Sequence, residues 1–305
     1  MPALLGLDPA VQLDVASRSG KAAMVVHPVA NIYDDYDDAL QRSPAEVVYI
    51  SLYNSAHYEW ALKSLRSGRH VVIDKPAFLT FAETMVALEI AEKAGRCVAE
   101  ATTFEYHSQF LHIDAFLSNF GPLNWISAQF SIPLLPIDNF RNHSDLGGGC
   151  LADMGPYAAA VARRFGPGTR MNIVAFPGRR HPLTGVDIGF SMLVGFADGL
   201  RISGNFGFGG EYVNCISFVA DGGTLMINRI FSPPPGHAPE WQMTLKNLGK
   251  KTEMRPADDA FKSFWVEFDT AIENGAYGAF RQNLLDDATF RERIRFQIER
   301  AQNVG

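Results

Sequence analysis

The feature that most constrains the fold is the alternation of strand-like and helix-like segments through the first hundred residues. Residues 46–52 form an apolar run typical of a strand buried on both faces, and residues 57–67 repeat apolar side chains at helical spacing. Residues 81–94 predict a second helix, because Thr80 and Glu83 form a capping box at its start. Further strands are expected at 13–17, 71–74 and 97–101. Such alternation predicts βαβ units and a parallel sheet.

The second part of the chain has a different pattern. Helices are expected at 108–120, 150–165, 258–274 and 284–301. Strand-like runs occur at 123–130, 172–176, 186–196, 200–208, 214–220 and 222–228. A chain of 305 residues suggests about two domains at roughly 150 residues each. We therefore predict an α/β domain over residues 1–102, followed over 103–305 by an α+β domain with an open, mostly antiparallel sheet.

Composition excludes several classes of protein. The chain has 27 Lys and Arg against 33 Asp and Glu, with no long run of one sign, so nothing indicates binding to nucleic acid or to a membrane surface. No stretch of about 18 apolar residues predicts a membrane span, and the N-terminus does not resemble a secretory signal. The cysteines Cys97, Cys150 and Cys215 are scattered, which argues against disulfides and a metal site and favours the cytoplasm.

A lysine follows one of the predicted parallel strands directly. Asp74, Lys75 and Pro76 stand at the carboxyl end of that strand, where ligands bind in sheets of this kind. The ammonium of Lys75 can polarise an oxygen or donate a hydrogen bond to a hydroxyl, and Pro76 favours an extended conformation at Lys75. On these residues alone, a surface lysine at a strand end is an equally open interpretation.

A second motif combines three glycines with an acid and a phenol. Asp153 and Tyr157 are four residues apart at the start of a predicted helix, so they lie on one face. A carboxylate and a phenol in this arrangement can orient a hydroxyl and transfer its proton. The preceding glycines, 147–149, allow close approach of the backbone to a ligand. Taken alone, an acid at a helix N-terminus with a core tyrosine is the favoured alternative.

The order of these motifs along the chain is more specific than any one of them. The turn at 53–57, the segment 74–76, the crossover 100–107 and the helix start 147–157 follow one another. In this the chain resembles the Gfo/Idh/MocA family of NAD(P)-dependent sugar and cyclitol oxidoreductases, most clearly over residues 44–160. It departs from the family pattern at three positions: Asp74 replaces a glutamate, Tyr157 a histidine and Tyr53 a proline.

The resemblance implies roles for the motif residues. Lys75 contacts the reacting hydroxyl or carbonyl, Tyr157 exchanges its proton and Asp153 holds the substrate. Asn54 and His57 line the nicotinamide side of the cleft, and Pro76 is counted with them among the cofactor-binding residues. For His57 the alternative is a histidine whose ring is satisfied locally at the helix start.

Two arginines are further candidates. Arg141 precedes the glycine loop and is a candidate for substrate contact, although a solvated loop arginine is the favoured alternative. Arg18, with Ser17, follows the strand at 13–17, where NAD-binding members carry an acidic residue for the ribose hydroxyl. Serine and arginine suit a 2′-phosphate instead, so NADP is expected in preference to NAD. The alternative is that Arg18 begins a polar loop.

One family element is missing from the sequence. The family begins with a strand and a G-x-G-x-x-G turn that carries the pyrophosphate, whereas residues 1–7 resemble the later part of the first helix. Two explanations are open: a shortened start of a longer natural protein, or a true short form that has lost dinucleotide affinity. The expected fold is thus a truncated Rossmann-like sheet followed by an open sheet.

The leading hypothesis is an NADP-dependent oxidoreductase acting on a small sugar-like or polyol substrate. The runner-up is a cofactor-free enzyme that uses the same lysine and tyrosine for an elimination, isomerisation or cyclisation. The third is a binding subunit without catalysis. The open face of the second sheet exposes apolar surface, and this predicts a homo-oligomer.

Overall fold

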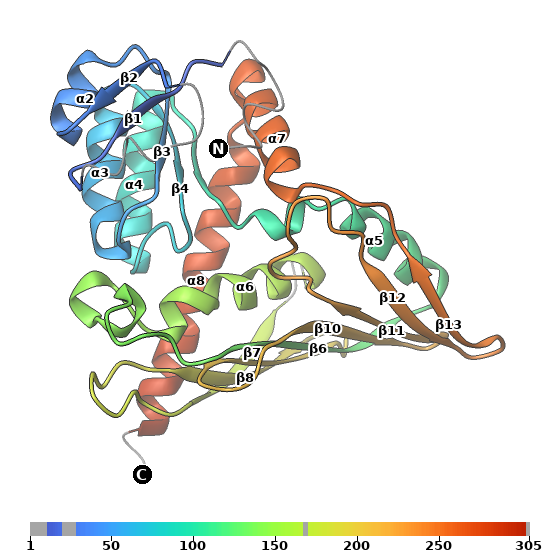
Figure 1. Cartoon of the computed structure of the whole chain (residues 1–305). Coiled ribbons are helices and arrows are strands. Elements are labelled where there is room, and N and C mark those ends of the chain that lie inside the picture. Colours follow the sequence, from blue (N-terminus) through green and yellow to red (C-terminus); the bar gives the residue numbers. More distant parts are fainter. Residues whose placement is uncertain (1–10, 20–28, 167–169, 303–305) are drawn as a thin grey trace.

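A computed structural model describes residues 11–19, 29–166 and 170–302. The N-terminal lobe contains a parallel three-stranded sheet with strand order β3-β4-β5. Its strands are β3 (Val47–Ile50), β4 (His70–Ile73) and β5 (Val98–Glu100). The helices of this lobe are α2 (Tyr36–Arg42), α3 (Asn54–Arg66) and α4 (Phe81–Ala94). The predicted parallel sheet is confirmed, and Figure 1 shows α3 and α4 beside it.

Helix α4 has the bounds expected from its capping residues. The Glu83 amide donates to Thr80 Oγ1 at 3.1 Å, and the Thr80 amide donates back to Glu83 Oε2 at 3.0 Å. Gly95 ends the helix in the left-handed conformation, with φ of 62°. Helix α3 begins at Asn54, three residues earlier than predicted, because Tyr53 already holds the extended backbone of an N-cap residue.

A separate two-stranded parallel sheet precedes this lobe in the chain. It consists of β1 (Asp14–Ala16) and β2 (Asn31–Tyr33). Within the described residues it does not pair with β3. Side chains make the connection instead: the Tyr36 and Trp60 rings pack edge to face at 5.0 Å, and the Arg18 guanidinium lies 4.6 Å from the Tyr36 ring centroid. The interpretation of residues 1–7 as part of a helix lies outside the described residues.

The second part of the chain forms one eight-stranded sheet, in the order β13-β12-β11-β10-β6-β9-β8-β7. Only the β6–β9 pair is parallel among the ladders of this sheet in the described ranges. The strands are β6 (Leu123–Ile132), β7 (Met171–Pro177), β8 (Gly189–Phe196), β9 (Arg201–Phe208), β10 (Val213–Ala220), β11 (Gly223–Asn228), β12 (Glu240–Leu245) and β13 (Gly249–Met254). The open, mostly antiparallel sheet is therefore confirmed.

The β12–β13 hairpin was not predicted from the sequence. Its edge strand β13 reads Gly-Lys-Lys-Thr-Glu-Met and is exposed along almost its whole length, so it lacks the apolar alternation that identifies a strand. Charged side chains on an edge strand discourage pairing with another sheet, which explains why this polar sequence is tolerated there.

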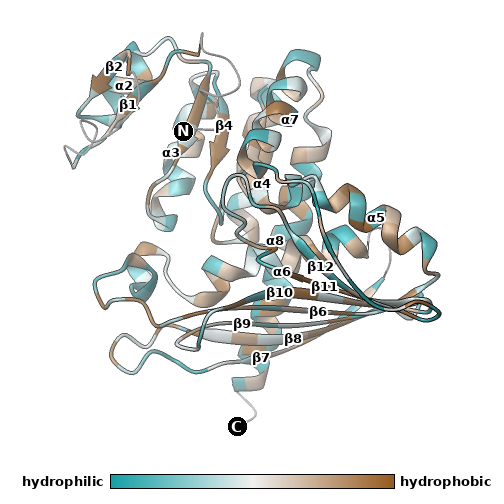
Figure 2. Cartoon of the chain, turned by 45° about the vertical axis from the view of Figure 1, so that its right-hand side comes forward, coloured by the Kyte–Doolittle hydropathy of each residue, from teal (hydrophilic) through white to brown (hydrophobic). Residues whose placement is uncertain are grey.

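Within the described residues, helices cover one face of the eight-stranded sheet. Helix α6 (Cys150–Phe165) has the predicted bounds and lies between the sheet and the N-terminal lobe, as Figures 1 and 2 show. Helix α5 (Gln109–Asn119) packs over the same core near one end of the sheet. Core residues alternate with outward residues along the inner strands, for example the buried Ile202 and Phe206 of β9.

The two C-terminal helices return to the N-terminal lobe. In α7 (Ala260–Asn274), Phe264, Trp265 and Phe268 pack with residues of β4 and β5, although the chain order assigns this helix to the predicted second domain. Helix α8 (Gly278–Gln302) begins six residues earlier than predicted and spans both lobes, with Leu284 in one core and Phe290 in the other. Within the described residues, no helix is long and apolar enough to cross a membrane.

Candidate functional site

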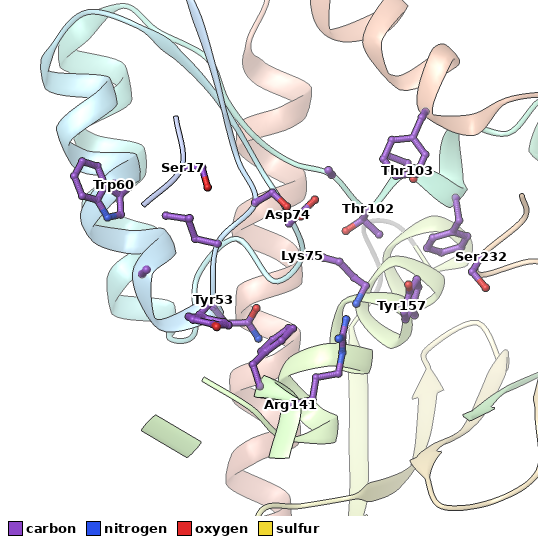
Figure 3. A pocket seen from close by; sticks show the side chains of 18 of the residues that line it. Ser17, Tyr53, Trp60, Asp74, Lys75, Thr102, Thr103, Arg141, Tyr157 and Ser232 are labelled. Carbon is purple, nitrogen blue, oxygen red and sulfur yellow. The ribbon is translucent and has the colours of Figure 1, made fainter. Parts of the chain in front are cut away.

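A cleft of about 960 Å³ lies between the N-terminal lobe and the helix-covered face of the large sheet. The carboxyl ends of β1, β3 and β4 open into it, as expected for a ligand site in a parallel sheet. Figure 3 shows side chains reaching into it from both lobes. Its walls include Ser17, Arg18, Tyr53, Asn54, Trp60, Asp74, Lys75, Thr102, Arg141, Tyr157 and Ser232.

Lys75 projects from the end of β4 across the cleft to helix α6. Its Nζ donates to Asp153 Oδ1 at 2.8 Å and to the Asp153 carbonyl oxygen at 2.7 Å. The same Nζ lies 4.9 Å from the centroid of the Tyr157 ring. The peptide bond between Lys75 and Pro76 is cis. The structure thus brings together the lysine and the tyrosine that the sequence places 82 positions apart (75 and 157).

Asp153 organises two cations rather than lining the cleft itself. Arg141 Nε lies 2.9 Å from Asp153 Oδ1, on the oxygen that also accepts from Lys75. Burial favours the neutral amine of Lys75, but the Asp153 carboxylate outweighs it and the pKa of Lys75 is raised. Burial would likewise raise the pKa of Asp153, but Lys75 and Arg141 hold it below the usual range. Two cations to one carboxylate leave this cluster with a net positive charge.

Tyr157 lies in an aromatic wall. Its ring contacts those of Phe104, Phe130 and Phe231, with centroids 5.6, 5.2 and 5.6 Å away. Burial raises the pKa of Tyr157, and the nearby Lys75 charge offsets only part of the effect. The phenol is therefore protonated at neutral pH and can donate a proton to an oxygen in the cleft.

The glycine loop serves packing between protein segments. A Cβ atom on Gly147 would lie 2.8 Å from Asn54 Cβ, and one on Gly149 would collide with the Asp187 carboxylate. Asn54 Nδ2 donates to the Gly147 carbonyl at 2.9 Å, which ties the start of α3 to this loop. The glycines were expected to let the backbone approach a ligand closely. In the structure they let it approach Asn54 and Asp187.

His57 and Pro76 lie behind the cleft wall. The His57 side chain is fully buried, and its Nδ1 and Nε2 lie 2.9 and 3.0 Å from the carbonyl oxygens of Pro76 and Leu52. Its ring is therefore engaged by local backbone, as in the alternative interpretation. Neither His57 nor Pro76 lines the cleft, whereas Asn54 does. Contact of these three residues with a cofactor stays a prediction.

The end of β1 carries the predicted phosphate-binding residues at one end of the cleft. Ser17 and Arg18 both line it. The Arg18 guanidinium lies 3.2 Å from Asp35 Oδ2 and stacks over Tyr36, with both members of the ion pair about half exposed. An arginine held this way can exchange a carboxylate partner for a phosphate without leaving its aromatic support.

The positions of the residues that line the cleft fit an extended dinucleotide. Ser17 and Arg18 at one end and Lys75 at the centre border the same continuous cleft, so one ligand can contact both. Within the described ranges, no group of three or more His, Cys, Asp or Glu side chains is placed to hold a metal ion. The three cysteines are free.

Sequence reasoning missed the far end of the cleft. Thr102, Thr103 and Phe104 enter it from the crossover, and Phe231, Ser232, Pro233, Ala260 and Phe261 enter it from beyond the large sheet. The signal for Thr102 and Thr103 was their place directly after a parallel strand. No local sequence pattern identifies the lining residues that follow β11, because they reach the cleft only through the tertiary fold.

Comparisons with known proteins agree with this geometry. Residues 10–102 match a family model described as the oxidoreductase family with an NAD-binding Rossmann fold, and residues 118–226 match the GFO/IDH/MocA C-terminal domain. The chain is 30% identical to a dTDP-3,4-didehydro-2,6-dideoxy-alpha-D-glucose 3-reductase of Streptomyces violaceoruber, over 87% of this chain and 78% of the relative. It is 27% identical to an NADP(+)-dependent D-xylose 1-dehydrogenase of Haloferax volcanii, over 86% and 81%.

Solved structures extend the similarity to the whole architecture. A 3-ketoreductase from Actinomadura kijaniata, solved with NADP and TDP-benzene, superposes with a TM-score of 0.90 at 26% identity. That match covers 97% of this chain and 92% of the other. Both lobes and the cleft between them therefore have counterparts in a known enzyme. Together with the two matched domain models, this shows that the chain belongs to the Gfo/Idh/MocA family of NAD(P)-dependent oxidoreductases.

Proposed function

We propose that this chain uses NADPH to reduce a keto group on a nucleotide-linked deoxysugar. The observation that carries the proposal is the meeting of Lys75 and Tyr157 in the cleft, with Nζ 4.9 Å from the ring centroid. The choice of substrate class rests on similarity to the dTDP-sugar 3-reductases and to the 3-ketoreductase solved with TDP-benzene. NADPH, when bound, supplies a hydride to the carbonyl carbon.

In this reaction the chain's residues act on the carbonyl oxygen. The Lys75 ammonium donates a hydrogen bond to that oxygen and stabilises the negative charge that develops on it. Tyr157 transfers its phenolic proton to the same oxygen and completes the alcohol. The raised pKa of Tyr157 keeps this proton in place until the oxygen becomes basic. The positive charge of Lys75 then stabilises the phenolate that remains.

Asp153 and Arg141 fix the position of the lysine. The Asp153 side chain is 9% exposed and holds both cations on one oxygen, so most of its hydrogen-bonding capacity is directed at protein. We therefore assign Asp153 to orienting Lys75, in place of the direct substrate contact that the family resemblance implied. Arg141 lines the cleft and adds a second donor for a substrate hydroxyl.

For the cofactor, Arg18 favours NADP over NAD. Its guanidinium supplies donors for a 2′-phosphate, and Ser17 supplies a hydroxyl beside it. We expect Arg18→Ala to weaken NADPH binding about tenfold and to leave NADH binding unchanged, because the site is exposed and screened. Fluorescence titration with both cofactors measures this, and Arg42→Ala, an exposed arginine in another aspartate pair, is the control. An equal loss for both cofactors would contradict the assignment.

The exposed face of the large sheet fits a second copy of the same chain. Outward residues of β6, β8 and β10 carry no formal charge, and β9 between them adds only Arg201 at its start, so most of this face is uncharged and can meet a second copy. Apolar side chains stand among them, including Trp125, Leu193 and Val219, each about two-fifths exposed. We expect a homo-oligomer that Leu193→Lys dissociates, as measured by light scattering on a sizing column. A monomeric wild type would contradict this.

Two further assignments complete the proposal. The free cysteines and the use of NADPH favour the cytoplasm as the site of action. Residues 1–102 and 103–305 are proposed as the two domains in chain order, with α7 and α8 returning from the second to support the first.

The proposed function is tested by incubating the purified chain with NADPH and a dTDP-linked 3-keto deoxysugar. We expect NADPH consumption matched by formation of the sugar alcohol. Absence of NADPH binding at millimolar concentration would overturn the proposal and favour a cofactor-free reaction or a binding role. Conversion of the sugar without any loss of NADPH would select the cofactor-free reaction.

A further inference from the structure

Arg229 has an unusual backbone at the end of β11. Its φ is 56°, and within the described ranges it is the only non-glycine residue with positive φ. Its amide donates to the Asn214 carbonyl at 2.6 Å, which holds this turn in place. An arginine in the left-handed region is uncommon, and strain of this kind is concentrated at ligand-binding positions.

Asn214 links the neighbours of Arg229 into one cluster. This side chain is 4% exposed, and its Nδ2 donates to Ser232 Oγ at 2.9 Å and to the Tyr212 hydroxyl at 3.2 Å. Its Oδ1 accepts from the Phe231 amide at 3.0 Å. A buried amide with three partners fixes the positions of the groups around it. Tyr212 and Ser232 are therefore preorganised beside the turn that carries Arg229.

The cluster carries positive charge without a carboxylate partner. The Arg229 guanidinium lies 5.7 Å from the Tyr212 ring centroid, and no acidic side chain forms an ion pair with it in the part of the chain that the structure describes. Burial alone would raise the pKa of Tyr212, but hydrogen bonding from Ser232 and Asn214 and the charge of Arg229 outweigh it and lower that pKa. The Tyr212 oxygen thus accepts a hydrogen bond from Asn214 and lies near the positive charge of Arg229.

The cluster adjoins the wall that holds the catalytic phenol. Ser232 lines the cleft next to Phe231, whose ring contacts Tyr157, and Figure 3 shows Ser232 on the far side of Tyr157 from Arg141. Tyr212 contacts Phe130 at 6.4 Å, and Phe130 contacts Tyr157 at 5.2 Å. Of the cluster, Ser232 lines the cleft, whereas Tyr212 and Arg229 lie just outside its lining, so a group attached to a sugar at Lys75 would reach the cluster past Ser232.

We propose that Arg229, Tyr212 and Ser232 bind the diphosphate of a nucleoside diphosphate-linked substrate. This inference rests on the proposed function, since it concerns the part of the substrate that does not react. Arg229 supplies a bidentate cation, and the hydroxyls of Tyr212 and Ser232 supply further donors to the phosphate oxygens. The Lys75 centre then receives the sugar while the nucleotide is held at this end of the cleft.

The test is calorimetric titration of dTDP into the chain, with and without saturating NADP⁺. We expect Arg229→Gln to weaken dTDP binding about ten- to a hundredfold, because a charge-assisted pair is lost. Arg66→Gln, an exposed arginine at the end of α3, is the matched control and should leave dTDP affinity unchanged. Thymidine, which lacks the diphosphate, should bind wild type and Arg229→Gln equally.

A second variant separates binding from folding. Glycine adopts positive φ without steric cost, so Arg229→Gly should keep or raise the unfolding temperature while losing dTDP affinity to the same extent as Arg229→Gln. Unchanged dTDP affinity in both variants would overturn the inference, and so would a wild type that does not bind dTDP. Failure of NADPH binding in wild type overturns the proposed function instead, and the arm without NADP⁺ still decides the role of Arg229.

Discussion

Two buried ion clusters lie on helix α6, and they have opposite charge ratios. At the start of the helix, Asp153 pairs with Lys75 and Arg141, so two cations meet one carboxylate. Three turns later, Arg163 pairs with Asp287 at 2.8 Å and with Glu105 at 2.7 Å, so two carboxylates meet one cation. Both clusters join segments that are distant in the sequence.

The difference separates a chemical role from a structural one. Lys75 and Arg141 line the cleft, so their excess positive charge is available to an oxygen of the substrate. Arg163, Glu105 and Asp287 do not line it, and the side chains are at most 16% exposed. Burial raises the pKa of Asp287 to about 7, against the opposing effect of Arg163. Changes in the first cluster should therefore affect rate, and changes in the second should affect stability.

The largest expected effect is on the rate of Lys75→Met. Loss of the ammonium removes the donor to the carbonyl oxygen, and we expect kcat/KM to fall about a thousandfold. The unfolding temperature should change little, because Asp153 keeps its pair with Arg141. Lys93→Met, an exposed lysine on α4, is the control. If Lys75→Met kept its activity within tenfold of wild type, the Asp153 cluster would have no catalytic role and the distinction between the two clusters would be wrong.

Arg163→Met should lower stability and leave the rate nearly unchanged. It leaves two carboxylates buried without a cation, and we expect the free energy of unfolding in urea to fall by about 3–5 kcal/mol. The folded fraction should retain kcat within about threefold of wild type. Arg164→Met is the neighbouring control: its partner Asp114 is about half exposed, so a loss below about 1 kcal/mol is expected. A rate defect without loss of stability would contradict the structural role.

Tyr157→Phe sharpens the account of the first cluster. The ring contacts are kept and only the hydroxyl is lost, so we expect kcat to fall about a hundredfold while cofactor affinity stays within twofold. Tyr58→Phe, which keeps its edge contact with Phe78, controls for a general effect of removing a phenol. A rise in KM with unchanged kcat would show that Tyr157 binds substrate without transferring a proton.

A further prediction concerns the pH dependence of stability at Asp287. An unfolded aspartate titrates near 3.8, whereas folded Asp287 titrates at about 7. Between these values the unfolded chain loses its proton first, so the contribution of Asp287 to unfolding free energy falls as pH rises from about 4 to about 7. Asp287→Asn should lack this decline, so its stability relative to wild type should rise across that window in urea titrations. Parallel pH profiles would contradict the raised pKa.

Local sequence patterns predicted the helices and strands, whereas contacts between distant segments determined the geometry of the site. Helix α4 followed from Thr80, Glu83 and Gly95, because capping is decided within a few residues. Lys75, Asp153 and Tyr157 were identified from motifs, but the sharing of one Asp153 oxygen by Lys75 and Arg141 was not. That contact depends on how the two lobes meet.

The same limit applies at the far end of the cleft and at the C-terminus. Arg229 lies in a segment without a turn signature, and its positive φ reflects the buried Asn214 beside it. The packing of α7 on β4 and β5 was not predictable, since an amphipathic helix does not specify which sheet it covers. His57 was predicted from a family motif, while its two carbonyl contacts come from the fold around it.

The most direct test of the central claim is a double-mutant cycle between Lys75→Met and Tyr157→Phe, measured on kcat/KM with NADPH. If both groups act on one carbonyl oxygen, their effects are coupled, and the double variant should be about as slow as Lys75→Met alone. If the two rate losses multiply, Lys75 and Tyr157 act independently, and the shared site described here would be contradicted.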